Sequence, residues 1–266
     1  MFYFLGDSFT WGQGLYFEKW IEEKTKFGNI KDIEKFKCVN VRHECLSFED
    51  NQFRIQNSFP HLVSKHYNMN YFVPKFTNGG TNYDIIHQLR TQVNTFNKEV
   101  ISHVFIQLTD FWRPMEFHLQ EPFTEEERKG LYIDGYGKNG RDIKIFDELI
   151  DTQINALKTF FEENSTCKFY VLSWHNDIAE RFISKLGDDE FVKIHYGGRV
   201  YDSFDWILNK VSLQSKYGIF DDHFTTEGHQ VIADSIIKKL GDIEHEELNE
   251  YAYLKRISYY NKNTII

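Results

Sequence analysis

A serine and a histidine, far apart in the 266-residue sequence, have the chemistry of a nucleophile and its base. Ser8 follows a Gly-Asp pair at the end of a short apolar run, and His223 follows a pair of aspartates. A serine hydroxyl becomes an effective nucleophile when a neighbouring imidazole accepts its proton, and that imidazole needs an acceptor that fixes its tautomer. We therefore predict that Ser8 attacks a carbonyl group and that His223 is its general base.

Two aspartates are candidates for the acid that orients His223. Adjacent side chains of an extended segment point apart, whereas those two residues apart point the same way, which favours Asp221 and leaves Asp222 as the alternative. Each motif also has a plainer interpretation. Gly-Asp-Ser suits a turn, and the Asp and Thr residues around His223 suit a helix cap.

The elements that must position these residues are strands that alternate with helices. Such alternation predicts a mostly parallel sheet with helices on both faces and an active site outside the carboxyl ends of its strands. Apolar runs predict strands at 2–5, 71–76, 104–108 and 168–173 and a weak one at 217–220. Helical spacing predicts helices at 58–67, 84–96, 145–161, 177–186 and 226–240.

This pattern predicts an α/β fold: a three-layer α/β/α domain with a flavodoxin-like parallel sheet of about five strands. We expect a single domain over 1–240 and a C-terminal tail over 241–266. The segments 15–55 and 111–145 are irregular and charged. Both are too long for ordinary connections and are predicted to be inserts that hold helices or a lid.

Composition excludes several classes of function. The formal net charge of -9 argues against a nucleic-acid partner, which clustered Lys and Arg would bind. No apolar run of about 18 residues predicts a membrane span, and no basic leader predicts secretion. The cysteines, Cys38, Cys45 and Cys167, lack metal-ligand spacing. Their odd number suits a reducing compartment, so we expect a cytoplasmic protein without a metal.

The order of the motifs resembles the SGNH hydrolases, also called GDSL-like lipases and esterases. Gly-Asp-Ser at 6–8 is similar to the family's first block, and His223 with Gly228 and His229 is similar to its last. Asn78-Gly-Gly80-Thr-Asn82 resembles its Gly block. The resemblance spans about 2–240. It implies an SGNH fold, a Ser–His–Asp site, oxyanion donors at the backbone N–H groups of Ser8 and Gly80, and no cofactor.

The chain departs from this family pattern at two places. The Gly-x-Asn-Asp block is replaced by Gln107-Leu-Thr109-Asp, so a third oxyanion donor would come from Thr109 or Asn82 or be missing. Loss of one such donor typically slows a reaction by about 100- to 1,000-fold. The family's acid usually stands three residues before the histidine, and that position is Phe220.

The resemblance implies hydrolysis of a short-chain acyl ester, with an acetyl group on a carbohydrate as the expected example. The substrate would be a small-molecule or glycan ester. A sugar O-acyltransferase with the same site is one alternative, and a catalytically degenerate glycan-binding protein is another; the aromatic content of 17% would suit the latter. Residues 174–177, Trp-His-Asn-Asp, follow a predicted strand and either contact substrate or begin a helix.

Overall fold

The computed structural model describes residues 1–23, 46–74, 82, 85–86, 88–90, 101–109, 143–219 and 221–243, and within these only the backbone of 143–150 and 177. The described part includes both ends of the predicted insert at 15–55 and only the last three residues, 143–145, of the predicted insert at 111–145. It excludes 24–45, 110–142 and all but the first three residues of the predicted tail.

Four parallel strands form the central sheet in the order β2-β1-β3-β4. They are β1 (Phe2–Leu5), β2 (Tyr71–Phe72), β3 (His103–Leu108) and β4 (Lys168–Ser173). All residues of β1 and β3 are buried, as is typical of parallel strands with both faces covered. The predicted strands at 2–5 and 168–173 are confirmed to the residue. Of the strand predicted at 71–76, β2 covers 71–72, residues 73–74 are not in a strand, and 75–76 lie outside the described residues.

The weak strand predicted at 217–220 is wrong for its described residues. Tyr217 ends a helix, and the backbone of Gly218 adopts the left-handed conformation (φ 70°) that closes the helix C-terminus. The fifth position of the sheet is held instead by a single parallel bridge between Phe191 and Val171 of β4. The strand order is therefore flavodoxin-like, with an abbreviated edge.

Helices follow the strands as the alternation predicts. The predictions near 58–67, 145–161, 177–186 and 226–240 are confirmed by α5, α8, α9 and α12. Of the helix predicted at 84–96, Ile85, Ile86 and Leu89 are helical and buried, and 91–96 lie outside the described residues. The bounds are α1 (Ser8–Trp11), α2 (Gln13–Glu23), α4 (Phe48–Asn57), α5 (Phe59–His66), α8 (Ile143–Glu163), α9 (Asn176–Leu186), α10 (Asp205–Val211), α11 (Leu213–Tyr217) and α12 (Thr226–Leu240).

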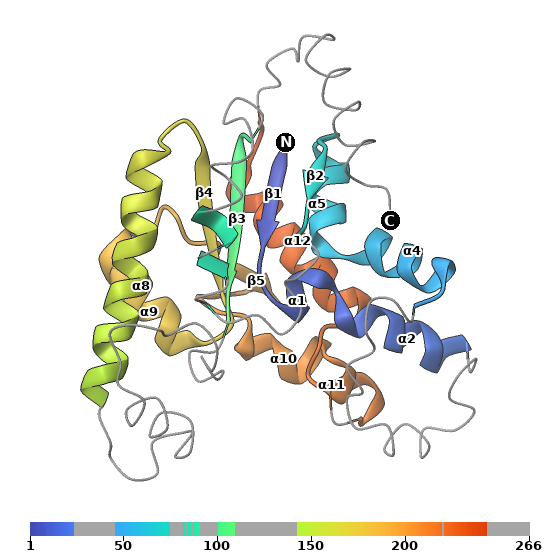
Figure 1. Ribbon diagram of the computed structural model, residues 1–266. Coiled ribbons are helices and arrows are strands. Elements are labelled where there is room, and N and C mark those ends of the chain that lie inside the picture. The colour runs from blue at the N-terminus through green and yellow to red at the C-terminus, as the bar shows by residue number, and fades with distance from the viewer. Residues whose placement is uncertain are drawn as a thin grey trace, which may run out of the picture.

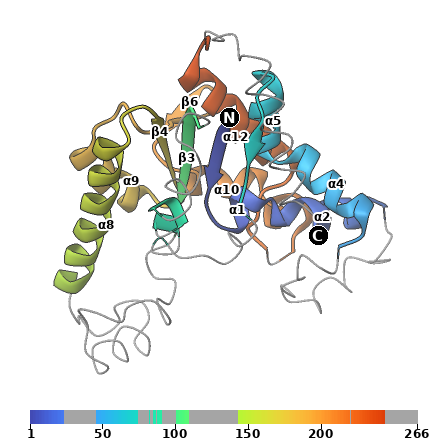
Figure 2. The ribbon, with the colours of Figure 1, turned by 45° about the horizontal axis from the view of Figure 1, so that its top comes forward.

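Alternate side chains of the strands enter two separate apolar clusters, which makes the fold three-layered. Tyr3 and Leu5 of β1 pack in one cluster with residues of α8 and α9, whereas Phe2 and Phe4 pack in the other with residues of α5, α10 and α12. Figure 1 shows α8 and α9 on one side of the sheet and α5 and α12 on the other, and Figure 2 shows the same division after a turn of the view.

Two further features lie beside these layers. A hairpin of β5 (Ile194–Tyr196) and β6 (Arg199–Tyr201) turns at Gly197 and Gly198, and the N–H group of His195 donates to Ser235 Oγ on α12 at 3.0 Å. A third apolar cluster joins α1 and α2 to α11. No helix in the described part of the chain has the length and apolar character to cross a membrane.

Candidate active site

Ser8 lies where β1 ends and α1 begins, at the carboxyl edge of the sheet. The turn before it is tight. A Cβ atom on Gly6 would lie 2.0 Å from Thr10 Oγ1 and 2.6 Å from Gln107 Oε1. A side chain at position 6 would displace Thr10 and Gln107 and break the hydrogen bond between them, so glycine favours close packing of the turn against β3.

A buried polar network fixes the turn that carries Ser8. One carboxylate oxygen of Asp7 accepts from the Phe9 N–H at 3.0 Å, and the other accepts from the Thr109 hydroxyl at 2.7 Å. The Gln107 side-chain oxygen accepts from the Asp7 N–H at 3.1 Å and from the Thr10 hydroxyl at 2.9 Å. The residues that replace the expected Asn block therefore anchor the nucleophile's turn to β3.

The loop that carries His223 rests on the N-terminal end of α11. The Leu213 N–H donates to the His223 carbonyl at 2.9 Å, and the Gln214 N–H donates to the Asp221 carbonyl at 2.7 Å. From the other side α2 packs closely, because a Cβ atom on Gly14 would lie 2.5 Å from the Phe224 carbonyl oxygen and 2.9 Å from His223 Cβ.

Ser8, His223 and Asp221 form a continuous hydrogen-bonded chain. Ser8 Oγ lies 2.7 Å from His223 Nε2, and His223 Nδ1 lies 2.7 Å from Asp221 Oδ1. Since a carboxylate only accepts, Nδ1–H donates to Asp221, and Nε2 of the neutral ring is free to accept from the Ser8 hydroxyl. Asp222 is exposed. The geometry thus places Asp221, the preferred candidate, against the imidazole.

The surroundings of His223 raise its pKa above the ordinary value of 6.5. Burial of the ring acts to lower the pKa, but the hydrogen bond to Asp221 and the negative charges of Asp221, Asp222 and Asp7 together outweigh it. The Phe9 ring packs against the imidazole with 5.0 Å between ring centroids. A raised pKa suits a base that must hold the serine proton during attack.

The expected oxyanion donors differ in whether they are already hydrogen-bonded. No acceptor is recorded for the Ser8 backbone N–H within the described residues, so this group is available. Gly80 lies outside the described residues. The Asn82 amide is engaged with the Thr109 backbone, donating to its carbonyl at 2.9 Å and accepting from its N–H at 2.8 Å. The Thr109 hydroxyl already donates to Asp7, and it would have to release that bond to reach an oxyanion.

Asp221, Asp222 and His223 offer oxygen and nitrogen atoms within 4.8 Å of one another, which is the spacing of a metal site. However, both ring nitrogens of His223 are already engaged, one with Asp221 and the other with Ser8. The arrangement among the described residues therefore suits proton transfer better than metal binding.

Aromatic side chains extend from His223 along the carboxyl edge of the sheet. Phe9 contacts Trp174 at 4.7 Å between centroids, and Trp174 stacks on His175 at 5.1 Å. Beyond them Trp206 is 54% exposed and stacks on Tyr201. His175 occupies the N-cap position of α9, so this segment, predicted either to contact substrate or to begin a helix, does begin one and also lines the site's edge.

Two residues of the site's framework were assigned no role from the sequence. Gln107 binds the Ser8 turn, and Glu18, 1% exposed, binds α12 beside the His223 loop. Glu18 carries a recognisable signal, since it lies three residues after Leu15 and three before Ile21, on the apolar face of a helix. Gln107 carries a weaker signal, a polar residue inside an apolar strand.

Comparison with known proteins provides one likeness at the level of structure. A solved structure similar to this chain is described as a candidate lipolytic protein of the G-D-S-L family from Desulfitobacterium hafniense DCB-2. The two are 14% identical, the match covers 90% of this chain and 98% of that chain, and the TM-score is 0.42. No protein-family model and no curated protein matches the sequence.

Proposed function

We propose that this chain is a serine hydrolase that cleaves an ester bond. The observation that carries the proposal is the chain of contacts from Ser8 Oγ through both His223 nitrogens to Asp221, with 2.7 Å at each step. A serine in this arrangement loses its proton to the imidazole as it attacks, which is the activation that acyl transfer requires.

The proposed reaction has two steps. In the first, Ser8 Oγ bonds to the ester carbonyl carbon while its proton moves to His223 Nε2. The carbon–oxygen bond to the alcohol then breaks, and Nε2–H returns that proton to the leaving alkoxide. In the second, water attacks the acyl–Ser8 ester, His223 accepts a proton from the water, and Ser8 leaves with that proton as the free hydroxyl. The Ser8 N–H supports the oxyanion in both steps.

The aromatic side chains beside the site support a substrate of carbohydrate type. Trp174 and His175 border Ser8 and His223 through Phe9. Exposed Trp206 donates to the side chain of Asn176, the residue after His175, at 3.4 Å. Grouped aromatic side chains of this kind are typical of ligand-binding surfaces. We accordingly propose a short-chain acyl ester on a sugar. A sugar hydroxyl could also replace water as the acyl acceptor, which is the O-acyltransferase alternative.

Reaction with a fluorophosphonate probe tests the proposal. The folded protein is incubated with the probe, and mass spectrometry locates the labelled peptide. We expect labelling at Ser8, no labelling in Ser8→Ala, and a large loss of rate in His223→Ala, because without the imidazole the hydroxyl keeps its proton. An unlabelled wild-type protein that is folded and carries no modification at Ser8 would contradict the proposal and favour the glycan-binding alternative.

A further inference from the structure

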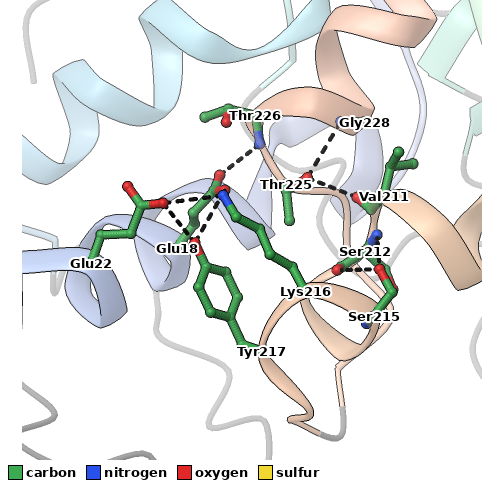
Figure 3. Close-up of polar contacts among 10 residues, drawn as sticks. All are labelled: Glu18, Glu22, Val211, Ser212, Ser215, Lys216, Tyr217, Thr225, Thr226 and Gly228. Carbon is green, nitrogen blue, oxygen red and sulfur yellow. Dashed lines mark hydrogen bonds and ion pairs between the residues drawn. The ribbon is translucent and has the colours of Figure 1, made fainter.

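Glu18 is a buried acidic residue on α2 that contacts two other elements. One of its carboxylate oxygens accepts from the Thr226 N–H at 2.6 Å, and the other lies 2.7 Å from Lys216 Nζ. The side chain is 1% exposed. Figure 3 shows it lying between the lysine of α11 and the first residue of α12.

The elements that Glu18 joins are those that carry the proposed catalytic groups. α2 begins two residues after α1, the helix that starts with Ser8, and α12 begins three residues after His223. Lys216 belongs to α11, whose first residues bind the carbonyls of His223 and Asp221. One carboxylate thus connects the nucleophile's segment to both segments that hold the base and the acid.

The contact to Thr226 has a specific physical role. The first N–H groups of a helix have no partner within it. In α12 the Thr225 hydroxyl accepts from the Gly228 N–H, which satisfies one of these groups. A second group, the Thr226 N–H, donates to Glu18, which belongs to α2. Negative charge is also favoured at a helix N-terminus. Loss of this contact would free the start of α12, three residues from His223.

The ion pair with Lys216 keeps the carboxylate in place. Burial acts to lower the pKa of Lys216, but its contacts with Glu18, Tyr217 and Glu22 raise it above its usual range. Lys216 itself is exposed, but the Glu18 carboxylate is buried, and a buried charge must be paired and hydrogen-bonded. Lys216 contacts one of its oxygens and the Thr226 N–H donates to the other.

We propose that Glu18 is a positioning residue that holds Ser8 and His223 at hydrogen-bonding distance, an inference that rests on the proposed function. Glu18 touches neither the reacting atoms nor substrate. It acts through α12 and α11. A catalytic geometry that depends on such support loses rate when it shifts by even about 1 Å.

Glu22 provides a matched control on the same helix. It lies one turn away, and its carboxylate contacts Lys216 at 3.1 Å and the Tyr217 hydroxyl at 2.7 Å, a hydroxyl that also lies 3.5 Å from Glu18 Oε1. It is exposed, and none of its recorded bonds reaches α12. Glu18→Gln leaves one acceptor oxygen for two donors, Lys216 Nζ and the Thr226 N–H, so the joint contact with α11 and α12 is broken. Glu22→Gln alters the same ion-pair network but not the contact with the start of α12 (Figure 3).

Thr226→Pro removes the same hydrogen bond from the other side. Proline lacks an N–H group and is favoured at the first position of a helix. The residue before a proline must be extended, and Thr225 already has φ -75° and ψ 175°. This variant should keep α12 while removing the donor to Glu18, and it tests the proposal even if Glu18→Gln fails to fold.

The first readout is the rate of fluorophosphonate labelling at Ser8, with the fold of each variant verified by circular dichroism. We expect Glu18→Gln and Thr226→Pro to lower the maximal labelling rate by about 10- to 100-fold with little change in the apparent affinity for the probe. Glu22→Gln should keep the wild-type rate. Wild-type rates in both Glu18→Gln and Thr226→Pro would overturn the proposal, as would an equal loss in Glu22→Gln.

The second readout does not require Ser8 to react. The proton on His223 Nδ1, which donates to Asp221, is followed by NMR. Its resonance should persist in Glu22→Gln and should broaden or vanish in the other two variants. If the wild type is not labelled but this pattern is seen, the proposed function fails and the positioning role stands. If the wild type is labelled and its resonance is unchanged in all three variants, the positioning role fails and the function stands.

Discussion

At the scale of single residues, the site is defined by how each hydrogen-bonding atom is used. His223 has one nitrogen on Asp221 and the other on Ser8, so its tautomer is fixed before any substrate arrives. Asp7, next to Ser8, has both carboxylate oxygens occupied and so acts in the framework of the turn. The two aspartates of the His223 loop differ in their contacts, because Asp221 contacts the imidazole ring and Asp222 is exposed.

Asp221→Asn tests this assignment through the pH dependence of labelling. The base must be neutral to accept a proton, so the wild-type rate should rise with pH through a midpoint above 6.5, the raised pKa of His223. Without the Asp221 charge the pKa falls, so the midpoint should move to lower pH. The maximal rate should also fall, by about 10³- to 10⁴-fold, because the tautomer is no longer fixed.

Asp222→Asn is the control for that experiment. Asp222 contributes to the raised pKa only through its charge, so its removal should lower the midpoint slightly and leave the maximal rate nearly unchanged. Equal losses of rate in the two variants would contradict the assignment of Asp221.

The central residues of the site could be predicted from sequence because each belongs to a local motif at the end of an element. Ser8 follows a strand and His223 precedes a helix, and the rule that strand ends gather at one edge brings them together. Glu18 could not be predicted in the same way. Its partners Lys216 and Thr226 lie about 200 positions away in the chain, and no local pattern encodes such a contact.

At the scale of elements, the approach of α2 to the His223 loop is set by the missing side chain of Gly14. Alanine has the higher helix propensity, by about 1 kcal/mol, and would stabilise α2 in isolation. In this position its Cβ would instead overlap the Phe224 carbonyl. The close packing of α2 against the His223 loop therefore outweighs the higher helix propensity that alanine would give α2.

Gly14→Ala should consequently lower both stability and activity. We expect a loss of about 1–3 kcal/mol in the free energy of unfolding from overpacking, measured by urea denaturation, and a fall of about 10- to 100-fold in Ser8 labelling. Glu23→Ala, at an exposed position of the same helix, should change neither quantity appreciably. A Gly14→Ala protein as stable and as reactive as the wild type would show that the two elements can separate without cost.

Element prediction succeeded where periodicity was long and failed where a short apolar run was ambiguous. The 15 residues of α12 carry a cap and a full apolar face, and their bounds were predicted to the residue. The run at 217–220 is too short to distinguish strand from helix end, and Gly218 decides the outcome by closing α11. The hairpin β5–β6 was not among the predicted strands, because each of its strands has only three residues.

At the scale of the whole molecule, the aromatic residues fill a two-sided core around the sheet. Two histidines are buried within it and are held neutral. Burial, together with nearby positive charge, lowers the pKa of His103 to about 4 and that of His229 to about 3. His229 accepts from the Phe59 N–H at 3.3 Å and stacks on the Phe59 ring.

These histidines predict a protein that loses stability in mild acid. Below pH 6.5 the unfolded chain binds protons at His103 and His229. In the folded chain these histidines stay neutral until pH approaches 4 for His103 and 3 for His229. The free energy of unfolding therefore decreases as pH falls. Each histidine lowers the free energy of unfolding by up to about 1.4 kcal/mol for every pH unit below 6.5 until its folded pKa is reached. The raised pKa of His223 has the opposite effect in a different window: its contribution to stability grows as pH falls from that raised pKa to about 6.5 and is constant below it, so it does not offset the loss at lower pH.

Urea denaturation at several pH values between 7 and 5 measures this effect. His229→Asn should be less stable at pH 7 because the stacking on Phe59 is lost, and its stability should depend less on pH by up to about 1.4 kcal/mol per unit. Phe59→Leu should also lose the stacking while it keeps the wild-type pH dependence. Parallel pH profiles for wild type and His229→Asn would contradict the prediction.

The 215 positions that separate Ser8 from His223 also have a consequence for biosynthesis. During translation Ser8 leaves the ribosome 215 residues before His223, and β1 must wait for both of its neighbouring strands, β2 and β3, because each is made later. The imidazole emerges only after every strand of the central sheet, and α12 follows it. On a growing chain the Ser8 hydroxyl therefore lacks its imidazole partner until the segment around His223 has folded back onto β1 and α1.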